Sequence, residues 1–228
     1  RFNKTDYMKS VNKIKEHIRI GDVYELNFCM DYHSNDIIID PIKSYISLNS
    51  LTESPMSAFF KLKSLHLLSS SPERFIKKKN NRIITQPIKG TIRRDKDITN
   101  DLKNINYLNN NSKELSENHM IVDLVRNDLS RVAKKGTVKV KELSVLYSFK
   151  NVHQLISTVE AEISNSTRIS KILESTFPMG SMTGAPKIRS MELIEKFEKT
   201  QRGIYSGAVG YITPKKDFDF NVVIRSII

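Results

Sequence analysis

A lysine inside an apolar stretch is the first residue of this sequence that could do chemistry. Lys89 lies between Ile88 and Gly90 in the segment TQPIKGTIRR, shortly after an Ile-Ile pair that is typical of a strand entering a core. Burying an ammonium costs several kcal/mol unless the group is paired or loses its proton. A lysine that loses its proton becomes a nucleophile, so the position of Lys89 favours covalent chemistry.

The same region predicts a carboxylate partner for this lysine. Residues 72–92 have the pattern of a β-hairpin, in which an Asn-Asn pair can adopt the positive φ of a tight turn. A turn centred on that pair sets Glu73 opposite Ile88 or Lys89, where Cβ atoms on facing strands are roughly 5 Å apart. Glu73 could then serve as an acid or a base, and a purely structural salt bridge is the alternative.

Two further carboxylates are spaced for one face of a helix. Glu114 and Glu117 are three residues apart in a segment, 112–132, that the sequence predicts to be helical. Such a pair suits Mg²⁺, which takes oxygen ligands and keeps several waters. The alternative is a solvated acidic face whose charged residues form surface ion pairs.

A glycine-rich loop precedes another predicted helix. In FPMGSMTGAPK, Gly180, Gly184 and Pro186 frame a turn whose helix N-terminus favours an anion. The spacing is not that of a nucleotide phosphate loop, so a carboxylate is the better ligand.

Three isolated residues could also contact a small acid. His153, Tyr205 and Arg225 can donate hydrogen bonds, and Arg225 can bind a carboxylate through two parallel bonds. Each could equally be a packed core-edge residue.

The elements that must position these residues follow from hydrophobic periodicity. Tyr7, Val11, Ile14 and Ile18 share one face of a helix that Thr5 or Asp6 can cap and Gly21 ends. Further helices are predicted at 40–50, 112–132 and 168–176, and after the glycine-rich loop, where Ile188, Met191, Ile194 and Phe197 share a face. Strands are predicted at 23–32, 56–62, 65–70, 137–142, 156–163, 205–212 and 218–228. In the strand 23–32, Glu25 and Asn27 alternate with apolar residues. The pattern indicates one α+β domain over 1–228 with a mainly antiparallel sheet.

Composition sets outer limits on the class of protein. The 228 residues contain 39% hydrophobic and 27% charged residues, as ordinary globular proteins do. The net charge of +12 comes from dispersed lysines and short clusters without interleaved aromatic residues, so we expect no nucleic-acid binding. The apolar runs are too short for a membrane span, no signal pattern is present, and the single cysteine excludes an internal disulfide; we therefore expect a cytoplasmic protein.

Taken together, these segments resemble the chorismate-utilising enzymes. The motifs SPERF, PIKGT, ENHMIVDLVRNDLSRV, VHQLIST, FPMGSMTGAPK, RGIYSGAVGYI and DFNVVIR occur in the family's order over nearly the whole chain. Within the family, PIKGT resembles the branch that aminates chorismate, whereas the anthranilate-forming branch would be expected to carry alanine where Lys89 stands. The resemblance implies a large antiparallel β-sandwich flanked by helices, with the active site between the sheets.

The resemblance also implies roles for the two central residues. Lys89 would attack C2 of chorismate while the C4 hydroxyl leaves, and Glu73 would protonate that leaving group. Ammonia would then add at C4 and expel Lys89, giving 4-amino-4-deoxychorismate. Alternatives are anthranilate or isochorismate synthesis or, in another class, a basic nucleic-acid-binding or partner-binding protein without catalysis.

The remaining roles follow from the same resemblance. Glu117 would bind Mg²⁺, with Glu114 close to it. A glutamine amidotransferase subunit or domain would supply ammonia, and the product would serve para-aminobenzoate and folate synthesis. The residues matching positions that contact chorismate are His153, Ser181, Thr183, Gly184, Tyr205 and Arg225.

The sequence departs from the family pattern at a few positions. Ser130 replaces a glycine in the RNDLGR pattern, and Met179 and Met182 replace glycine and isoleucine in the loop. The resemblance also predicts an N-terminal region and a C-terminal glycine-rich, acidic segment that completes the metal site. We therefore expect the 228 residues to be a fragment that lacks both ends.

Overall fold

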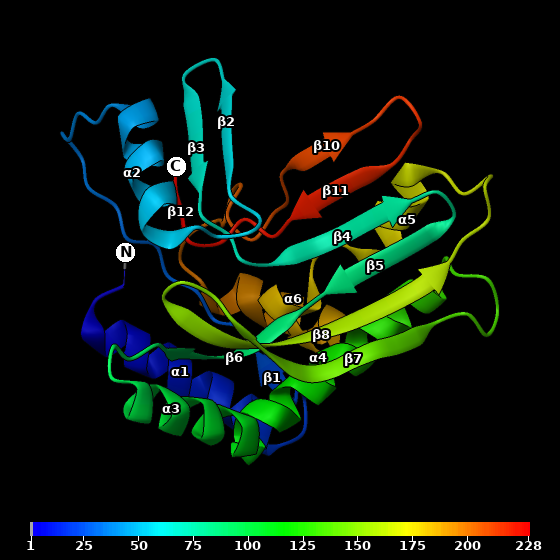
Figure 1. Ribbon diagram of the computed structural model, residues 1–228. Helices are drawn as coiled ribbons and strands as arrows, with labels where there is room; N and C mark the ends of the chain where they lie inside the picture. Colours follow the sequence, from blue (N-terminus) through cyan, green and yellow to red (C-terminus); the bar gives the residue numbers. More distant parts are fainter. Residues whose placement is uncertain (1) are drawn as a thin grey trace.

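A long antiparallel sheet forms the centre of the protein (Figure 1). The computed structural model describes residues 2–228. The strand order is β10-β11-β4-β5-β8-β6, and β7 pairs with the other edge of β8. The strands are β4 (Arg74–Lys79), β5 (Arg82–Gln86), β6 (Ile88–Arg93), β7 (Lys139–Ser148), β8 (Val152–Glu162), β10 (Gly210–Ile212) and β11 (Phe218–Asn221). This sheet and the helices around it confirm the predicted α+β class.

α3 and α4 lie below this sheet in Figure 1, where α4 runs along β6, β7 and β8, whereas α2 lies beside β3. The helices are α1 (Lys4–Arg19), α2 (Pro41–Thr52), α3 (Ile98–Asn110), α4 (Ser112–Ser130), α5 (Ile169–Thr176) and α6 (Lys187–Phe197), and a short 3₁₀ turn, η1, spans Gly180–Met182. Among the described residues, none of these helices is long and apolar enough to cross a membrane.

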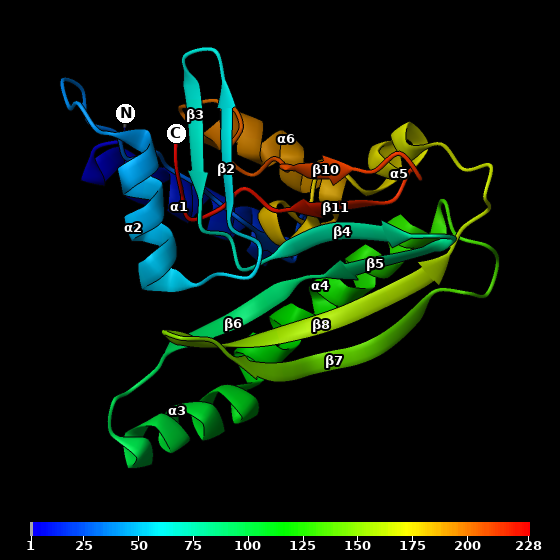
Figure 2. The ribbon, with the colours of Figure 1, turned by 45° about the horizontal axis from the view of Figure 1, so that its top comes forward.

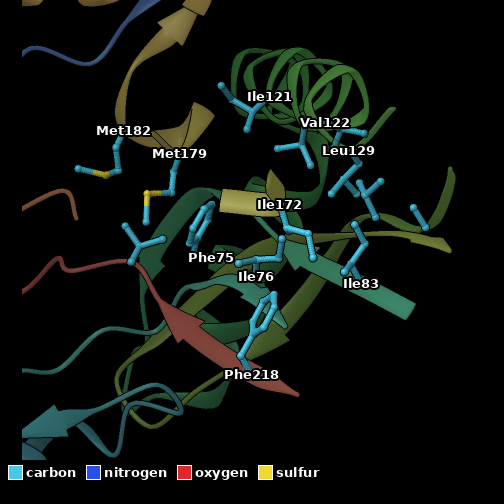
Figure 3. Close-up of a cluster of buried hydrophobic side chains, with 14 of the residues drawn as sticks. Phe75, Ile76, Ile83, Ile121, Val122, Leu129, Ile172, Met179, Met182 and Phe218 are labelled. Carbon is cyan, nitrogen blue, oxygen red and sulfur yellow. The ribbon is translucent and has the colours of Figure 1, made fainter. Parts of the chain in front are cut away.

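The main core lies between α4, α5 and the sheet (Figure 3). Ile121, Val122 and Leu129 on one face of α4 meet Ile76 and Ile83 from β4 and β5, and all five are at most 3% exposed. Burying each such side chain contributes about 1.5–3 kcal/mol. This core fixes α4 against the strands that carry the candidate residues.

Two smaller sheets lie beside the large one. β2 (Ala58–Leu62), β3 (Leu65–Ser69) and β12 (Ser226–Ile227) form one, which stands next to α2 in Figure 2. β1 (Glu25–Leu26) pairs with β9 (Gly184–Ala185) to form the other. A second core cluster of Ile14, Val23, Leu193 and Phe197 joins α1 to α6.

The predicted hairpin over residues 72–92 is correct only in its first part. Asn80 has a φ of 55°, and Lys79 pairs with Arg82, as the Asn-Asn turn predicts. The segment contains three strands, however, because Pro87 lacks an amide hydrogen and interrupts the ladder. β5 and β6 therefore pair with successive parts of β8, whose Ser157 N–H donates to the Pro87 carbonyl at 3.2 Å.

Three other sequence predictions need correction. The helix α3 was not predicted, because its asparagine-rich sequence has a weak apolar pattern. Only Glu25 and Leu26 of the predicted strand 23–32 enter a ladder. In α6 the buried residues are Ser190, Leu193 and Phe197, and Ile188 is 72% exposed, because the small Ser190 faces the closely packed β1 and β9.

Candidate active site

Glu73 lies immediately before β4 and is only 4% exposed. Its carbonyl accepts a hydrogen bond from the Val222 N–H at 3.0 Å, which fixes the backbone. Its carboxylate accepts hydrogen bonds from the Ser181 hydroxyl at 2.6 Å and from the backbone N–H of Ile88. The structure thus brings Glu73 and Ser181 together and aims the carboxylate at β6.

The surroundings of Glu73 set its proton affinity. Burial raises its pKa to about 7, while the Ser181 hydrogen bond and the charges of Lys89 and Arg225 act in the opposite direction. A carboxyl group with a pKa near neutrality can both hold and release a proton at physiological pH, which is what a general acid needs. A small cavity of about 20 Å³ is bordered by Glu73 and Ser181.

Lys89 is on β6, and its direct partner is Glu25 rather than Glu73. Its Nζ forms an ion pair and hydrogen bond with Glu25 Oε1, and the two side chains are 16% and 14% exposed. The predicted opposition of Glu73 and Lys89 is therefore corrected, because the register shift between Arg74 and Lys77 and the break at Pro87 displace the two strands. Lys89 remains close enough for its charge to act on Glu73.

A tight backbone contact places Glu25 in this site. Glu25 pairs with Ala185, and Leu26 pairs with Gly184, which has a φ of 144°. A Cβ on Gly184 would lie 2.1 Å from the Glu25 carbonyl oxygen, so only glycine fits. The predicted importance of Gly184 thus has a structural reason in this chain.

Side chains and loop carbonyls hold the segment around Glu25 to the glycine-rich loop. The Asn27 side-chain amide donates to the Ser181 carbonyl at 2.7 Å. Arg202 donates to the Met182 carbonyl at 2.6 Å and to the Asn27 carbonyl at 2.7 Å, and it is paired with Glu198. Sequence reasoning did not identify Asn27, Arg202 or Glu198 as site residues, because their partners are backbone oxygens of a remote loop.

The two hydroxyl residues of the loop have different orientations. Ser181 donates to Glu73, whereas Thr183 donates back to the Met179 carbonyl at 3.0 Å. Both are buried. Of the two, Ser181 belongs to the cluster around Glu73, and Thr183 shapes the loop.

Arg225 and Tyr205 border the site. Desolvation lowers the pKa of Arg225, and the negative charge of Glu73 acts against this shift, so the guanidinium lies within range of that carboxylate. Burial raises the pKa of Tyr205 to about 12, which keeps its phenol protonated as a donor. Tyr205 Oη lies 4.0 Å from Cys29 Sγ. Arg225 is thus near Glu73, while Tyr205 faces the segment that follows Glu25.

His153 has partners that were not among the predicted site residues. Its Nε2 lies 2.9 Å from Asp101 Oδ1 and its Nδ1 lies 2.8 Å from the Ser148 hydroxyl, and the ring is 1% exposed. The first bond ties α3 to β8, and the second joins β7 to β8. Contact between His153 and a substrate stays a prediction.

Glu114 and Glu117 lie on the first turns of α4, where a Cβ on Gly90 would be 3.4 Å from Glu114 Cβ. Lys113 Nζ lies 2.8 Å from Glu117 Oε1 and 3.6 Å from Glu114 Oε1, and both carboxylates are about a quarter exposed. Two accessible carboxylates fit Mg²⁺, which completes its shell with water and substrate oxygens. Within residues 2–228, no cluster of three or more His, Cys, Asp or Glu residues could hold a metal by itself.

Comparison with known proteins adds two kinds of similarity. A family model described as chorismate binding enzyme matches residues 1–228. The chain is 39% identical over 224 residues to aminodeoxychorismate synthase component 1 of Escherichia coli, covering 98% of this chain and 49% of that protein. It is 36% identical to anthranilate synthase component 1 of Neisseria meningitidis serogroup B, covering all of this chain and 46% of that protein. The chain thus spans about half the length of these curated relatives.

A solved structure has the same arrangement of elements. Anthranilate synthase component I from Streptococcus pneumoniae superposes with a TM-score of 0.85 at 27% identity, covering 99% of this chain and 50% of that one. The fold described above is therefore shared with this chorismate enzyme.

Proposed function

The chain belongs to the family of chorismate binding enzymes, and from that premise we propose that it aminates chorismate to 4-amino-4-deoxychorismate. The observation that carries the proposal is Lys89, a mostly buried, paired lysine whose charge acts on the buried carboxyl group of Glu73. Relatives named aminodeoxychorismate synthase component 1, at 36–39% identity, support this choice of reaction.

In the proposed mechanism, the reacting groups are the amine of Lys89 and the carboxyl of Glu73. The uncharged amine attacks C2 of chorismate, the two conjugated double bonds of the ring shift, and the hydroxyl at C4 leaves. Hydroxide is a poor leaving group, so a carboxyl with a pKa of about 7 is well suited to give it a proton. Ammonia then adds at C4, the two double bonds shift back, and Lys89 is released with the overall loss of one water.

The charges around the site suit a dianionic substrate. Arg225, near Glu73, can bind a carboxylate, and Ser181 holds Glu73 in place. Glu117, with Glu114 beside it, would hold Mg²⁺ at the start of α4. When bound, the ion would neutralise and orient the substrate carboxylate beside the reacting carbon.

A partner and a pathway follow from this reaction. The name component 1 of the relatives implies a second component, and we propose a glutamine amidotransferase that supplies the ammonia. The product would be used in the cytoplasm for para-aminobenzoate and folate synthesis.

Anthranilate synthesis is the second candidate, because anthranilate synthase relatives are nearly as similar in sequence. Product analysis separates the two. The full chain, incubated with chorismate, Mg²⁺ and ammonium, is expected to give 4-amino-4-deoxychorismate by liquid chromatography and mass spectrometry. Formation of anthranilate and pyruvate instead would contradict the proposal.

A further inference from the structure

Among the described residues, the side chain that accepts a hydrogen bond from the Lys89 ammonium is Glu25, 64 residues earlier in the chain. Glu25 and Lys89 come from different sheets, β1 and β6, and their side chains are mostly buried. A protonated lysine cannot attack carbon, so a lysine nucleophile held in this pair must first give up a proton. Glu25 is the group in hydrogen-bond contact with that proton.

The second oxygen of the Glu25 carboxylate has room for a further bond. Glu25 Oε2 is buried and has no hydrogen-bond partner among the described residues. A buried acceptor without a partner costs about 1–3 kcal/mol. Oε1 accepts the hydrogen bond from Lys89, while Oε2 has no partner and is free to accept a further hydrogen bond.

The backbone fixes Glu25 more firmly than an ordinary surface residue. The close fit of Gly184 against the Glu25 carbonyl leaves no space for a side chain. The Asn27 N–H donates to the Thr183 carbonyl at 2.8 Å, directly after the two-residue strand. A base that must meet a nucleophile in one geometry needs such positioning.

Glu73 cannot serve as this base without losing its other role. In the proposed reaction Glu73 delivers a proton at C4, and its carboxylate is held by Ser181 and the N–H of Ile88. Lys89 is thus in hydrogen-bond contact with Glu25, while its charge acts on Glu73, whose carboxylate has its own partner in Ser181.

We propose that Glu25 is the proton acceptor of Lys89, a catalytic role that rests on the proposed function. As the bond from Lys89 Nζ to C2 forms, one proton passes from Nζ to Glu25, and the electron pair of the broken C4–O bond leaves with the oxygen, which Glu73 protonates. When ammonia adds at C4 it gives one proton to Glu73, and as the Nζ–C2 bond breaks, Glu25 returns its proton to Nζ. The lysine and Glu25 end the cycle as they began.

The test follows adduct formation in single turnovers without ammonia, read as the intact mass of the full chain with chorismate and Mg²⁺. Glu25→Gln keeps the size of the side chain but cannot accept the proton. At pH 7 we expect adduct formation to slow by about 10²–10⁴-fold. Glu192→Gln, at an exposed ion pair on α6, is the matched control.

A second variant separates proton transfer from structural support. Glu25→Ala leaves space for a small carboxylate, so added formate or acetate should restore adduct formation, and the more basic acetate should restore more per molecule bound. Thermal melting shows whether each variant is folded. If Glu25→Ala or Glu25→Gln does not fold, Glu25→Asp is tested in its place. Because Glu25→Asp keeps a carboxylate, it should retain more activity than Glu25→Gln.

The outcomes distinguish the two proposals. An adduct rate in folded Glu25→Gln within a few-fold of that of the unmodified protein, or absence of carboxylate rescue in folded Glu25→Ala, overturns the role of Glu25 alone. If the unmodified protein forms neither adduct nor 4-amino-4-deoxychorismate, the proposed function fails, and the role of Glu25 fails with it.

Discussion

Two buried lysine–carboxylate pairs lie in different regions of this molecule. Lys187, the first residue of α6, is 2.5 Å from Asp128 near the end of α4, and their side chains are 13% and 4% exposed. Lys89 and Glu25 join β6 to β1 with similar burial. In each pair, one buried carboxylate oxygen has no hydrogen-bond partner. Residue type, pairing and burial therefore do not separate the two lysines.

Their neighbours do separate them. Lys187 also donates to the Thr176 carbonyl at 3.2 Å, so it ties together α4, α5 and α6. Burial raises the pKa of Asp128 and lowers that of Lys187, as expected for a pair held away from water. Lys89 instead lies beside Glu73, whose pKa is about 7, with Ser181 and Arg225 close by. A lysine acquires a chemical role from the acid, base and substrate ligands around it.

The largest effect on enzymatic activity is expected from substitution of Lys89 rather than Lys187. Lys89→Ala removes the proposed nucleophile, and we expect it to abolish both the chorismate adduct and 4-amino-4-deoxychorismate formation in assays with ammonium. The substitution also leaves the mostly buried Glu25 without its counter-charge, so thermal melting first checks that the variant is folded. Turnover by folded Lys89→Ala at a rate close to that of the unmodified protein would show that no covalent lysine is needed.

Glu73 should give the next largest effect. Glu73→Gln cannot protonate the leaving hydroxyl, so we expect a loss of about 10²–10⁴-fold in kcat. Only the protonated carboxyl is active, and its pKa of about 7 means that kcat/KM of the unmodified protein should fall as the pH rises through 7. A rate that stays flat from pH 6 to 9 would argue against this role.

The raised pKa of Glu73 also makes the free energy of unfolding depend on pH. Because the folded pKa of Glu73 is above the ordinary value of 4.5, folding favours the protonated form. The stabilisation is complete below about 4.5 and is lost as the pH rises through about 7. Urea unfolding at pH 5 and pH 8 should show this loss in the unmodified protein and a smaller one in Glu73→Gln.

Substitutions in the Lys187–Asp128 pair should lower the free energy of unfolding rather than change the reaction. Lys187→Met leaves Asp128 buried without its counter-charge, and breaking a buried pair in this way costs about 3–5 kcal/mol. Urea unfolding measures the loss. The double variant Asp128→Asn with Lys187→Met removes both charges and should regain much of it; a double variant no more stable than the single one would contradict this interpretation.

The smallest expected effect concerns Mg²⁺. Glu117→Gln weakens a predicted ligand, and we expect the Mg²⁺ affinity in the presence of chorismate to fall by about tenfold or more, at least the typical effect of losing an outer partner of a metal site. Calorimetric titration measures binding directly. Glu16→Gln, at an exposed ion pair on α1, is the control, and identical titrations for all three proteins would exclude Glu117 as a ligand.

Much of the candidate site could be predicted because its signals are local. The turn at Asn80 follows from a few neighbouring residues, and so do the helix α4 and the unusual setting of Lys89. The partner of Lys89 could not be predicted in this way. The alternation in 23–32 predicts only that Glu25 is on the polar side of its strand, while the two-residue pairing with Gly184 decides what it faces.

The other errors have similar physical causes. Pro87 divides a pattern that reads as one strand, and the pairing shift after Arg74 moves Glu73 away from direct opposition to Lys89. Helical spacing gave α6 a plausible apolar face, but Ser190 is buried because β1 and β9 approach the helix too closely for a larger side chain. Long-range backbone contacts of this kind leave no periodic signal in the sequence.

The most direct test of the account is to find which lysine chorismate modifies. The full chain is incubated with chorismate and Mg²⁺ without ammonia, quenched, digested and mapped by mass spectrometry. The account predicts an added mass of chorismate less one water on the peptide containing Lys89, none on the peptide containing Lys187, and its disappearance when ammonium is added. Formation of 4-amino-4-deoxychorismate with Lys89 unmodified at every time point would contradict it.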